Sequence, residues 1–207
     1  MYNTSFSDSM ITEDYLIAFE KRVADEFNNA QIRAPIHLHG GNESELIKIF
    51  SCVKAQDWIF SSWRSHYHCL LKGVSDDQLF EDICKGKSIT LLYPEQKIYT
   101  SAIVGGIIPI ALGAAKALQL SGASDHVYLF MGEMTSETGA ASEAHRYATN
   151  FDLPITFIIE DNGKSVCTNT SDAWGSSTLS LIGKPKVMYY SYELPWPHAG
   201  AGTRVQF

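Results

Sequence analysis

The second half of the chain alternates between helical patterns and short apolar runs. Residues 126–132 (HVYLFMG) and 153–163 (LPITFIIEDNG) are dense in apolar side chains over the length of a strand, which is typical of strands that are covered on both faces. Residues 102–122 and 136–152 have the spacing and composition of helices. This helix–strand–helix–strand order, with short connections, predicts right-handed crossovers and a parallel sheet.

The first half of the chain is mainly helical in its pattern. Apolar side chains recur at helical spacing over residues 12–31, and Thr12 and Glu13 are start signals for that helix. After an extended piece and a Gly-Gly turn, a second helix is expected to begin at Asn42 or Ser44. The N-terminal third is therefore expected to be an α-helical segment.

Three further segments complete the expected organisation. Residues 57–73 predict a short strand or loop that leads into a helix ending at Gly73, and residues 75–86 predict a compact helix whose acidic first turn suits the helix dipole. Residues 186–196 predict a strand. We predict one doubly wound α/β domain over residues 1–207, with helices on both faces of a mostly parallel sheet and the helical N-terminal segment packed against it.

Composition excludes several classes of function. The chain has 207 residues, 45% of them hydrophobic, which suits one globular domain. A net charge of −7 and the lack of any basic run of five argue against binding to nucleic acid. The longest apolar stretch, within residues 102–115, is interrupted by glycines and a proline and is too short to span a bilayer. No export signal is visible near the N-terminus, so we expect a cytoplasmic protein with no membrane partner.

The cysteines and several histidines carry no recognisable motif. The wide spacing of the four cysteines predicts reduced, buried thiols at Cys52, Cys69, Cys84 and Cys167. Four histidines are interpreted as surface or packing residues: His39, His68, His126 and His145. His66 and His68 point apart because they are two residues apart on a predicted helix, which argues against zinc binding by that pair.

Two acid- and amide-bearing turns follow the two apolar strands of the second half. Glu133 follows the first strand directly after Gly132, and Asn162 and Gly163 follow the second. Because parallel strands end at one edge of a sheet, these turns are expected to lie side by side at the edge where α/β sheets bind ligands. Oxygen ligands completed by phosphate are what Mg²⁺ prefers, and a helix N-terminus attracts phosphate. The spacing predicts a Mg²⁺-bridged diphosphate; the alternative is that Glu133 caps a helix and Asn162 fills a turn.

The segment from Gly132 to Asn162 resembles the thiamine-diphosphate motif of the α subunits of 2-oxo acid dehydrogenase E1 components, a branch of the transketolase-like superfamily. Glu143–Ala144, Leu153–Pro154 and Asp161–Asn162 match the positions of that motif. Three upstream stretches resemble further motifs of the family in the same order: HLHGGNESE at 37–45, SSWRSHYHCLLKG at 61–73 and IVGGIIPIALGAAKAL at 103–118. Together the four motifs cover about residues 15–165.

The resemblance implies a metal and diphosphate site. It implies three ligands for Mg²⁺, namely Glu133, Asn162 and the backbone carbonyl of Lys164. It implies that Gly132 and the backbone amides of Met134 and Thr135 face the diphosphate.

The resemblance also implies roles for residues of the first half. Arg64 would contact a phosphate as a planar, charge-assisted donor, where the alternative is a surface ion pair. Trp63 stands in the place of an aromatic hydroxyl residue, and Val104 would present its backbone to the aminopyrimidine ring. His37 and His66 would lie near the reacting carbon, where an imidazole can bind a carboxylate or move protons; for His37 the alternative is a structural histidine.

Three features of the sequence depart from the family pattern at the site. Glu133 stands where the family has Asp, so the carboxylate ligand is one methylene longer. This matters because Mg²⁺ demands ligand distances of about 2.0–2.1 Å. Met134 stands where the family has Gly, and its side chain leaves less room for the phosphates. Asp161 stands where the family has Asn. The later His-Ser loop that grips the diphosphate has no counterpart after residue 165, and His198 is the only late candidate.

The resemblance implies that this chain is one half of an active site. In the family, the glutamate that activates the cofactor comes from a pyrimidine-binding domain on a β subunit, and we find no second domain in this sequence. We therefore expect a β-type partner chain, an α₂β₂ assembly and an exposed apolar face for docking. The predicted activity is decarboxylation of a 2-oxo acid such as pyruvate with transfer of the acyl unit. The alternatives are a split transketolase-like or acyloin-forming carboligase, acting on a keto acid or ketose, and a non-catalytic subunit with a degenerate site.

Overall fold

Six strands form one sheet within the part of the chain that this computed structural model describes, residues 11–176, 178–199 and 205–207. Their order across the sheet is β2-β3-β1-β4-β5-β8, and every neighbouring pair is parallel except β2 with β3. The strands are β1 (Trp58–Ser61), β2 (Leu92–Tyr93), β3 (Ile98–Thr100), β4 (Val127–Gly132), β5 (Ile155–Asp161) and β8 (Val187–Ser191). A separate hairpin consists of β6 (Lys164–Ser165) and β7 (Thr168–Asn169).

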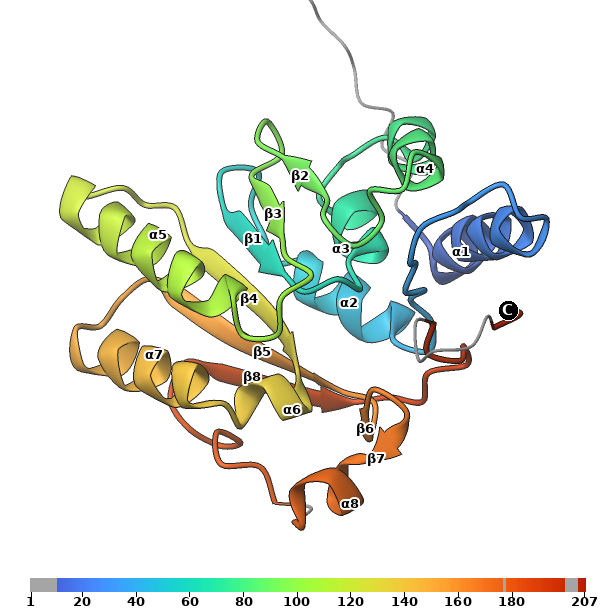
Figure 1. The fold of residues 1–207 in the computed structure, drawn as a ribbon. Coiled ribbons are helices and arrows are strands. Elements are labelled where there is room, and N and C mark those ends of the chain that lie inside the picture. Colours follow the sequence, from blue (N-terminus) through green and yellow to red (C-terminus); the bar gives the residue numbers. More distant parts are fainter. Residues whose placement is uncertain (1–10, 177, 200–204) are drawn as a thin grey trace, which may run out of the picture.

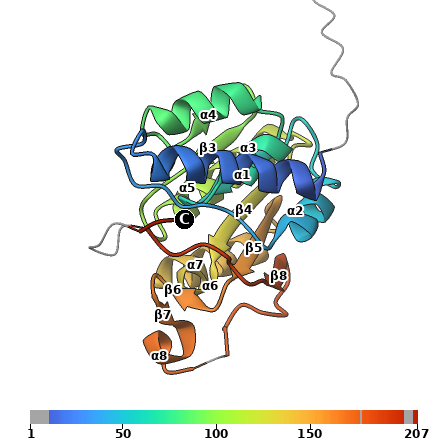
Figure 2. The same cartoon turned by 90° about the vertical axis from the view of Figure 1, so that its right-hand side faces the viewer.

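Eight helices surround the sheet in the described residues (Figure 1). They are α1 (Glu13–Asn28), α2 (Glu43–Phe50), α3 (His66–Leu71), α4 (Asp76–Cys84), α5 (Ile107–Ser121), α6 (Glu133–Ser136), α7 (Gly139–Asn150) and α8 (Thr170–Trp174). Figure 2 shows α1 and α4 together on one side, and the β6–β7 hairpin and α8 extending away from the opposite end.

Alternate side chains of β4 belong to different cores, which shows that helices cover both faces of the sheet. Phe130 is buried in the core that includes residues of α1, α2, α3 and α4. Leu129 and Met131 are buried in the second core, together with residues of α5 and α7. Because successive side chains of a strand point to opposite faces, the continuous apolar run predicted this arrangement. The doubly wound α/β fold with an N-terminal helical segment is confirmed.

Most element boundaries follow from local capping. Thr12 begins α1 by accepting the backbone N–H of Tyr15 (3.3 Å), as the sequence predicted. Helix α5 ends at Gly122, which adopts the left-handed conformation (φ 69°) that favours glycine. Asn42 stands at the N-cap of α2 without a capping side-chain bond; its amide instead donates to Tyr190 Oη at 3.1 Å.

Some predicted boundaries are wrong. The helix expected over 102–122 begins only at Ile107, because the chain turns before it and Gly105 has φ 73°. The segment 136–152 is helical only from Gly139, where α7 begins. The buried state predicted for all four cysteines holds only for Cys69. Cys52 and Cys167 are exposed, Cys84 is half-buried, and the described thiols are all free.

Among the described residues, no helix combines the length and apolar character needed to cross a bilayer.

Candidate functional site

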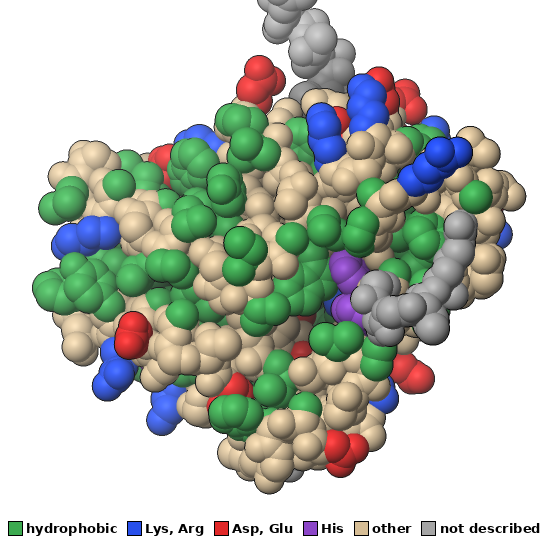
Figure 3. All heavy atoms as spheres, in the orientation of Figure 1, with side chains coloured by type: hydrophobic (Ala, Val, Ile, Leu, Met, Phe, Trp, Pro, Cys, Tyr) green, Lys and Arg blue, Asp and Glu red, His purple; other side chains and the backbone are tan. Residues whose placement is uncertain are grey.

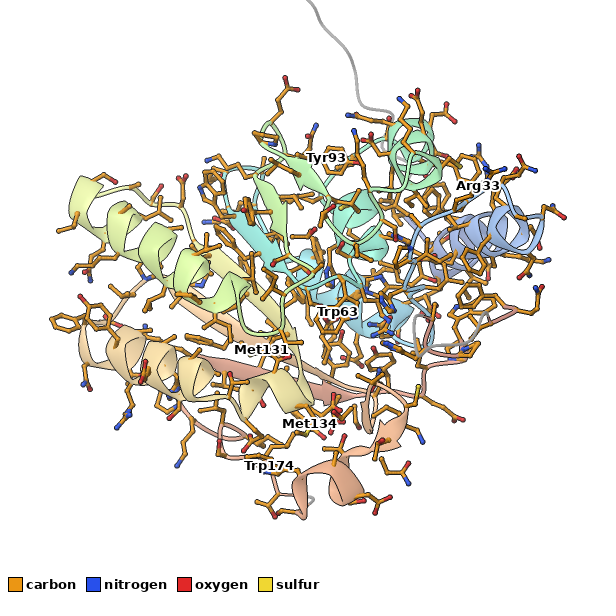
Figure 4. All side chains as sticks on the ribbon, in the orientation of Figure 1. Arg33, Trp63, Tyr93, Met131, Met134 and Trp174 are labelled. Atoms are coloured by element: carbon orange, nitrogen blue, oxygen red, sulfur yellow. The ribbon has the colours of Figure 1, made fainter. Side chains whose placement is uncertain are left out.

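A cavity of about 590 Å³ lies at the edge where β1, β4 and β5 end. Because these strands are parallel neighbours, the turns that follow them meet at this edge. The cavity brings together nine of the eleven predicted site residues: Trp63, Arg64, Val104, Gly132, Glu133, Met134, Thr135, Asn162 and Lys164. Figure 4 marks Trp63 and Met134 of this set, and also Met131, which lies in the core beneath α5 and α7. The expectation that the two turns lie side by side is thus fulfilled by the fold.

Glu133 is the first residue of α6 and is almost completely buried. Its Oε1 accepts a hydrogen bond from Thr170 Oγ1 at 2.7 Å, so α8 holds the carboxylate in place. Burial raises the pKa of this carboxyl, against the lowering effect of the Thr170 bond. Gly132 precedes it, and the space where a Cβ would stand at Gly132 is open. The carboxylate therefore lies beside room for a ligand.

The Asp-Asn-Gly turn after β5 is closed by its own side chains. Asp161 Oδ1 accepts the N–H of Gly163 at 2.8 Å, and Asn162 Oδ1 accepts the N–H of Lys164 at 3.0 Å. Gly163 has φ 69°, which favours glycine. The other oxygen of Asp161 accepts from Tyr189 Oη at 2.8 Å. Asp161 therefore serves the turn, whereas Asn162 both closes the turn and lines the cavity.

The oxygen donors at this edge suit a small divalent cation. Glu133 offers a carboxylate, and a carboxamide oxygen such as that of Asn162 has a second lone pair beside the one used in the turn. The ammonium of Lys164 is held by Asn169 Oδ1 at 2.6 Å, within the β6–β7 hairpin. Hard oxygen ligands of this kind, few in number and completed by phosphate, fit Mg²⁺. The residues present therefore fit a Mg²⁺–diphosphate group.

Two histidines lie at the other side of the cavity. His198 lines it, and its ring centroid is 4.5 Å from that of His37. His37 is not part of the lining, but its ring also lies 6.0 Å from that of Trp63, and its buried Nδ1 has no partner among the described residues. The space-filling view shows histidine side chains at this hollow (Figure 3). Arg64 donates from Nε to the carbonyl of Leu38 at 2.9 Å and keeps its guanidinium at the cavity.

Both of these histidines are neutral at neutral pH. Burial, followed by the charge of Arg64, lowers the pKa of His37 to about 3. The same two causes lower the pKa of His198. Neutral imidazoles can each donate one hydrogen bond and accept one, so they can orient a substrate carbonyl or carboxylate.

Acid should destabilise the fold through His37. The unfolded chain protonates this side chain near its ordinary pKa of 6.5, whereas the folded chain does so only near 3. Between these values the unfolded state binds more protons, so the free energy of unfolding falls as the pH falls. Urea unfolding of wild type and His37→Gln between pH 7 and pH 5 is expected to show a shallower decline for the variant. Equal slopes would contradict this assignment.

The structure does not bring His66 to the cavity. It is fully buried, with Nδ1 2.9 Å from Glu20 Oε1 and Nε2 2.8 Å from Ser88 Oγ. Both ring nitrogens are therefore engaged in the core between α1 and α3, and the position near a reacting carbon that the resemblance implied is not supported by this placement.

Several residues of the cavity wall were not predicted as site residues from the sequence. Glu160 lines the cavity and accepts from Tyr190 Oη at 2.5 Å. Tyr192 and Trp196 reach the cavity because the chain leaves the sheet after β8. Cys167 lies at the tip of the β6–β7 hairpin. Only the position of Glu160 at the end of a predicted strand gave a signal that could have found it.

A sequence model of a known family covers most of this chain. The model for the dehydrogenase E1 component matches residues 12–188. The chain belongs to this family. The match to the dehydrogenase E1 component includes β1, β4, β5 and the turns that build the cavity. The resemblance drawn from four motifs is thereby confirmed.

Individual members of the E1 component family are similar over most of this chain. The α subunit of acetoin:2,6-dichlorophenolindophenol oxidoreductase from Cupriavidus necator is 28% identical over 176 residues, which cover 80% of this chain and 52% of that protein. The pyruvate dehydrogenase E1 component subunit α of Rickettsia typhi is 28% identical over 180 residues, or 82% of this chain and 54% of that protein. The acetoin oxidoreductase subunit α of Bacillus subtilis is 26% identical over 194 residues, or 83% and 58%. The chain thus spans about half the length of these relatives.

Proposed function

We propose that this chain is the α-type subunit of a two-chain enzyme that holds Mg²⁺ and thiamine diphosphate and decarboxylates a 2-oxo acid such as pyruvate, transferring the acyl unit. One observation carries the proposal: nine residues with implied cofactor roles line a single cavity in a chain of the E1 component family. The names of the relatives, pyruvate dehydrogenase E1 and acetoin oxidoreductase α subunits, support the same class of chemistry.

The residues of the cavity would divide the binding between them. Glu133, Asn162 and the Lys164 carbonyl would hold Mg²⁺, and the backbone amides of Met134 and Thr135 would face the diphosphate at the start of α6. Arg64 would add a planar donor for phosphate. When bound, thiamine diphosphate supplies addition to a carbonyl and stabilisation of the resulting carbanion.

The remaining residues would orient the substrate and exclude water. The neutral imidazoles of His37 and His198 would hold a substrate oxygen by hydrogen bonds. Trp63 and Trp196 enclose this side of the cavity with apolar surface, which strengthens polar interactions inside it. Val104 would present its backbone to the cofactor ring from the loop before α5.

An exposed apolar surface supports the existence of a partner chain. Figure 3 shows apolar side chains gathered over α5 and α7, and the exposed ones include Ile103, Val104, Ile110, Tyr147 and Phe151. Val104 belongs both to this surface and to the cavity wall, so a docked partner would close the cavity. We propose that a β-type subunit binds here, supplies the activating glutamate and forms an α₂β₂ assembly. Cytoplasmic location stays a prediction.

A charge on this surface should prevent assembly. Ile103, 71% exposed beside the cavity, is expected to be buried by the partner, so Ile103→Asp would place a carboxylate in the interface. Co-purification with the partner should be lost, while the thermal unfolding of the chain alone stays unchanged. Leu92→Asp is the matched control, because Leu92 is 56% exposed on β2, at the far edge of the sheet. Assembly that survives Ile103→Asp, or fails equally with Leu92→Asp, would contradict this interface.

Two alternative functions remain open to experiment. A split transketolase-like or acyloin-forming carboligase would use the same cofactor site with an aldehyde acceptor. A non-catalytic subunit is favoured by one observation, the bond that ties Glu133 to Thr170 beside the bulky Met134.

Calorimetry and product analysis separate the three functions. Thiamine diphosphate and Mg²⁺ are titrated into the chain complexed with its partner, and saturable binding is expected; its absence favours the non-catalytic subunit. Product analysis with pyruvate, with and without an aldehyde, then separates acyl transfer after decarboxylation from carboligation.

A further inference from the structure

A second group of ligand-type side chains includes Glu160 of the cavity wall and two histidines that are not part of the lining. His39, His68 and Glu160 are buried and each offers one nitrogen or oxygen atom, and these atoms lie within 4.8 Å of one another. They come from three separate elements: the loop before α2, helix α3 and strand β5. The spacing of His66 and His68 argues against a metal shared by that pair, and the fold instead brings His68 beside His39.

The polar contacts of this group are incomplete. His68 Nε2 lies 3.3 Å from Glu160 Oε1. His39 Nε2 is buried and has no hydrogen-bond partner among the described residues, and the same holds for Asn42 Oδ1. The amide nitrogen of Asn42 donates to the hydroxyl of Tyr190, which in turn donates to Glu160. A buried polar atom without a partner costs free energy, so the unpartnered Nε2 of His39 within the cluster indicates that a further atom belongs there.

We propose that His39, His68 and Glu160 bind a transition-metal ion of the zinc type. Two imidazoles and one carboxylate are a common set of three protein ligands for Zn²⁺, with a fourth position open to water or a further oxygen. The imidazoles separate this site chemically from the all-oxygen site at Glu133, because Mg²⁺ takes oxygen ligands.

The surroundings hold both rings in place. The ring of His39 stacks on Tyr67, with centroids 4.7 Å apart and planes at 11°. The ring of His68 lies 4.1 Å from that of Phe130. His68 Nδ1 is 2.8 Å from Ser61 Oγ. This hydroxyl oxygen can accept a hydrogen bond from the Nδ1–H group when Nε2 binds the metal. Outer partners of this kind orient metal-binding histidines.

Metal binding has one local cost. His39 Nδ1 accepts the backbone N–H of Tyr67 at 3.3 Å, which directs the ring proton to Nε2. Coordination through Nε2 moves that proton to Nδ1 and breaks this long contact. Tyr67 lies in the first turn of α3, where N–H groups have no partner within the helix. Metal binding therefore takes that bond from two buried donors, the His39 Nδ1–H and the Tyr67 N–H, with Glu20 Oε1 4.0 Å from Nδ1. In return it gains ligation that fastens α3 and the loop before α2 to β5.

Metal titration of the full chain tests the site. Chain purified without a histidine tag and stripped with a chelator is titrated with Zn²⁺, and in parallel with Co²⁺ while its absorption bands are recorded. We expect one equivalent of tight binding and cobalt bands of a tetrahedral nitrogen–oxygen site. His39→Phe and His68→Phe should each weaken binding by roughly 100-fold or more, and Ser61→Ala by about 10-fold.

The controls separate this site from other histidines and from the proposed Mg²⁺ site. His126 lies outside the cluster, and Glu133 belongs to the cavity. The His126→Phe and Glu133→Gln variants should therefore both bind zinc as the wild type does. Failure to take up zinc at micromolar concentrations, or equal uptake by a His39→Phe/His68→Phe double variant, overturns the proposal. If these variants do not fold, zinc-edge X-ray absorption of the wild type decides, with two imidazole ligands expected and an all-oxygen shell contradicting the site. None of these results depends on cofactor binding or activity.

Discussion

Replacing Asn162 with Ala should abolish the Mg²⁺-dependent binding of thiamine diphosphate. The change removes a proposed metal ligand and also the acceptor that closes the turn through the Lys164 N–H. Changes in groups that only orient a metal ligand cost 10–100-fold in affinity, so removal of a ligand should cost at least about 100-fold. Calorimetry on the assembled complex, with and without Mg²⁺, measures this loss.

Asn162→Asp is the matched control for this experiment. It keeps an oxygen acceptor for the Lys164 N–H and an oxygen ligand for the metal, so most of the affinity should remain. Because Asn162 is at the surface end of β5 rather than in a core, neither change should lower the thermal midpoint greatly. Unchanged affinity of Asn162→Ala would remove this residue from the site and, with it, the main support for a metal at this edge.

Replacing Phe130 with Ala should destabilise the fold by about 3–5 kcal/mol. Phe130 is fully buried on β4 and packs 5.7 Å from the ring of Phe50 and 4.1 Å from that of His68. Truncation leaves a cavity between the central strand and the helices α2 and α3, and it removes aromatic contacts that add to the loss. A loss of this size is a large share of the stability of a typical domain. Urea unfolding of the chain measures it.

Phe151→Ala is the control for the core substitution. Phe151 follows α7 and is 50% exposed, so its truncation should cost less than about 1 kcal/mol. Equal effects of the two changes would mean that the core on the α1–α4 face does not carry the stability that its burial indicates. Since Phe130 also contacts His68, its loss is expected to weaken the proposed zinc site as well.

The parts of the fold that the sequence predicted are those with strong local signals. The apolar runs of β4 and β5 are long enough to be recognised as strands in the sequence. Thr12 is a helix-capping residue type, and it caps the N-terminus of α1 in the structure. Strands β2 and β3 are two and three residues long, too short for a periodic pattern. The sequence does not predict them, because β3 is held by its parallel pairing with the distant strand β1, and β2 by its antiparallel pairing with β3, rather than by a pattern of their own.

The candidate site also contains residues that the sequence predicted and residues that it did not. Glu133 and Asn162 were found because each follows a recognisable strand, and parallel strands bring such turns to one edge. His66 matched a motif but lies in a core network with Glu20 and Ser88. The contact of His37 with His198 joins residues 161 positions apart, which no local pattern encodes.

The sequence by itself determined the family, the fold class and the edge of the sheet at which ligands bind, because these depend on short-range periodicity, caps and ordered motifs. Only the tertiary structure decided which histidines face the cavity, which lie in the core, and that His39, His68 and Glu160 share one buried position. The physical reason is that strand register and helix packing determine which side chains of distant segments come into contact. Those are properties of the assembled sheet and its two cores.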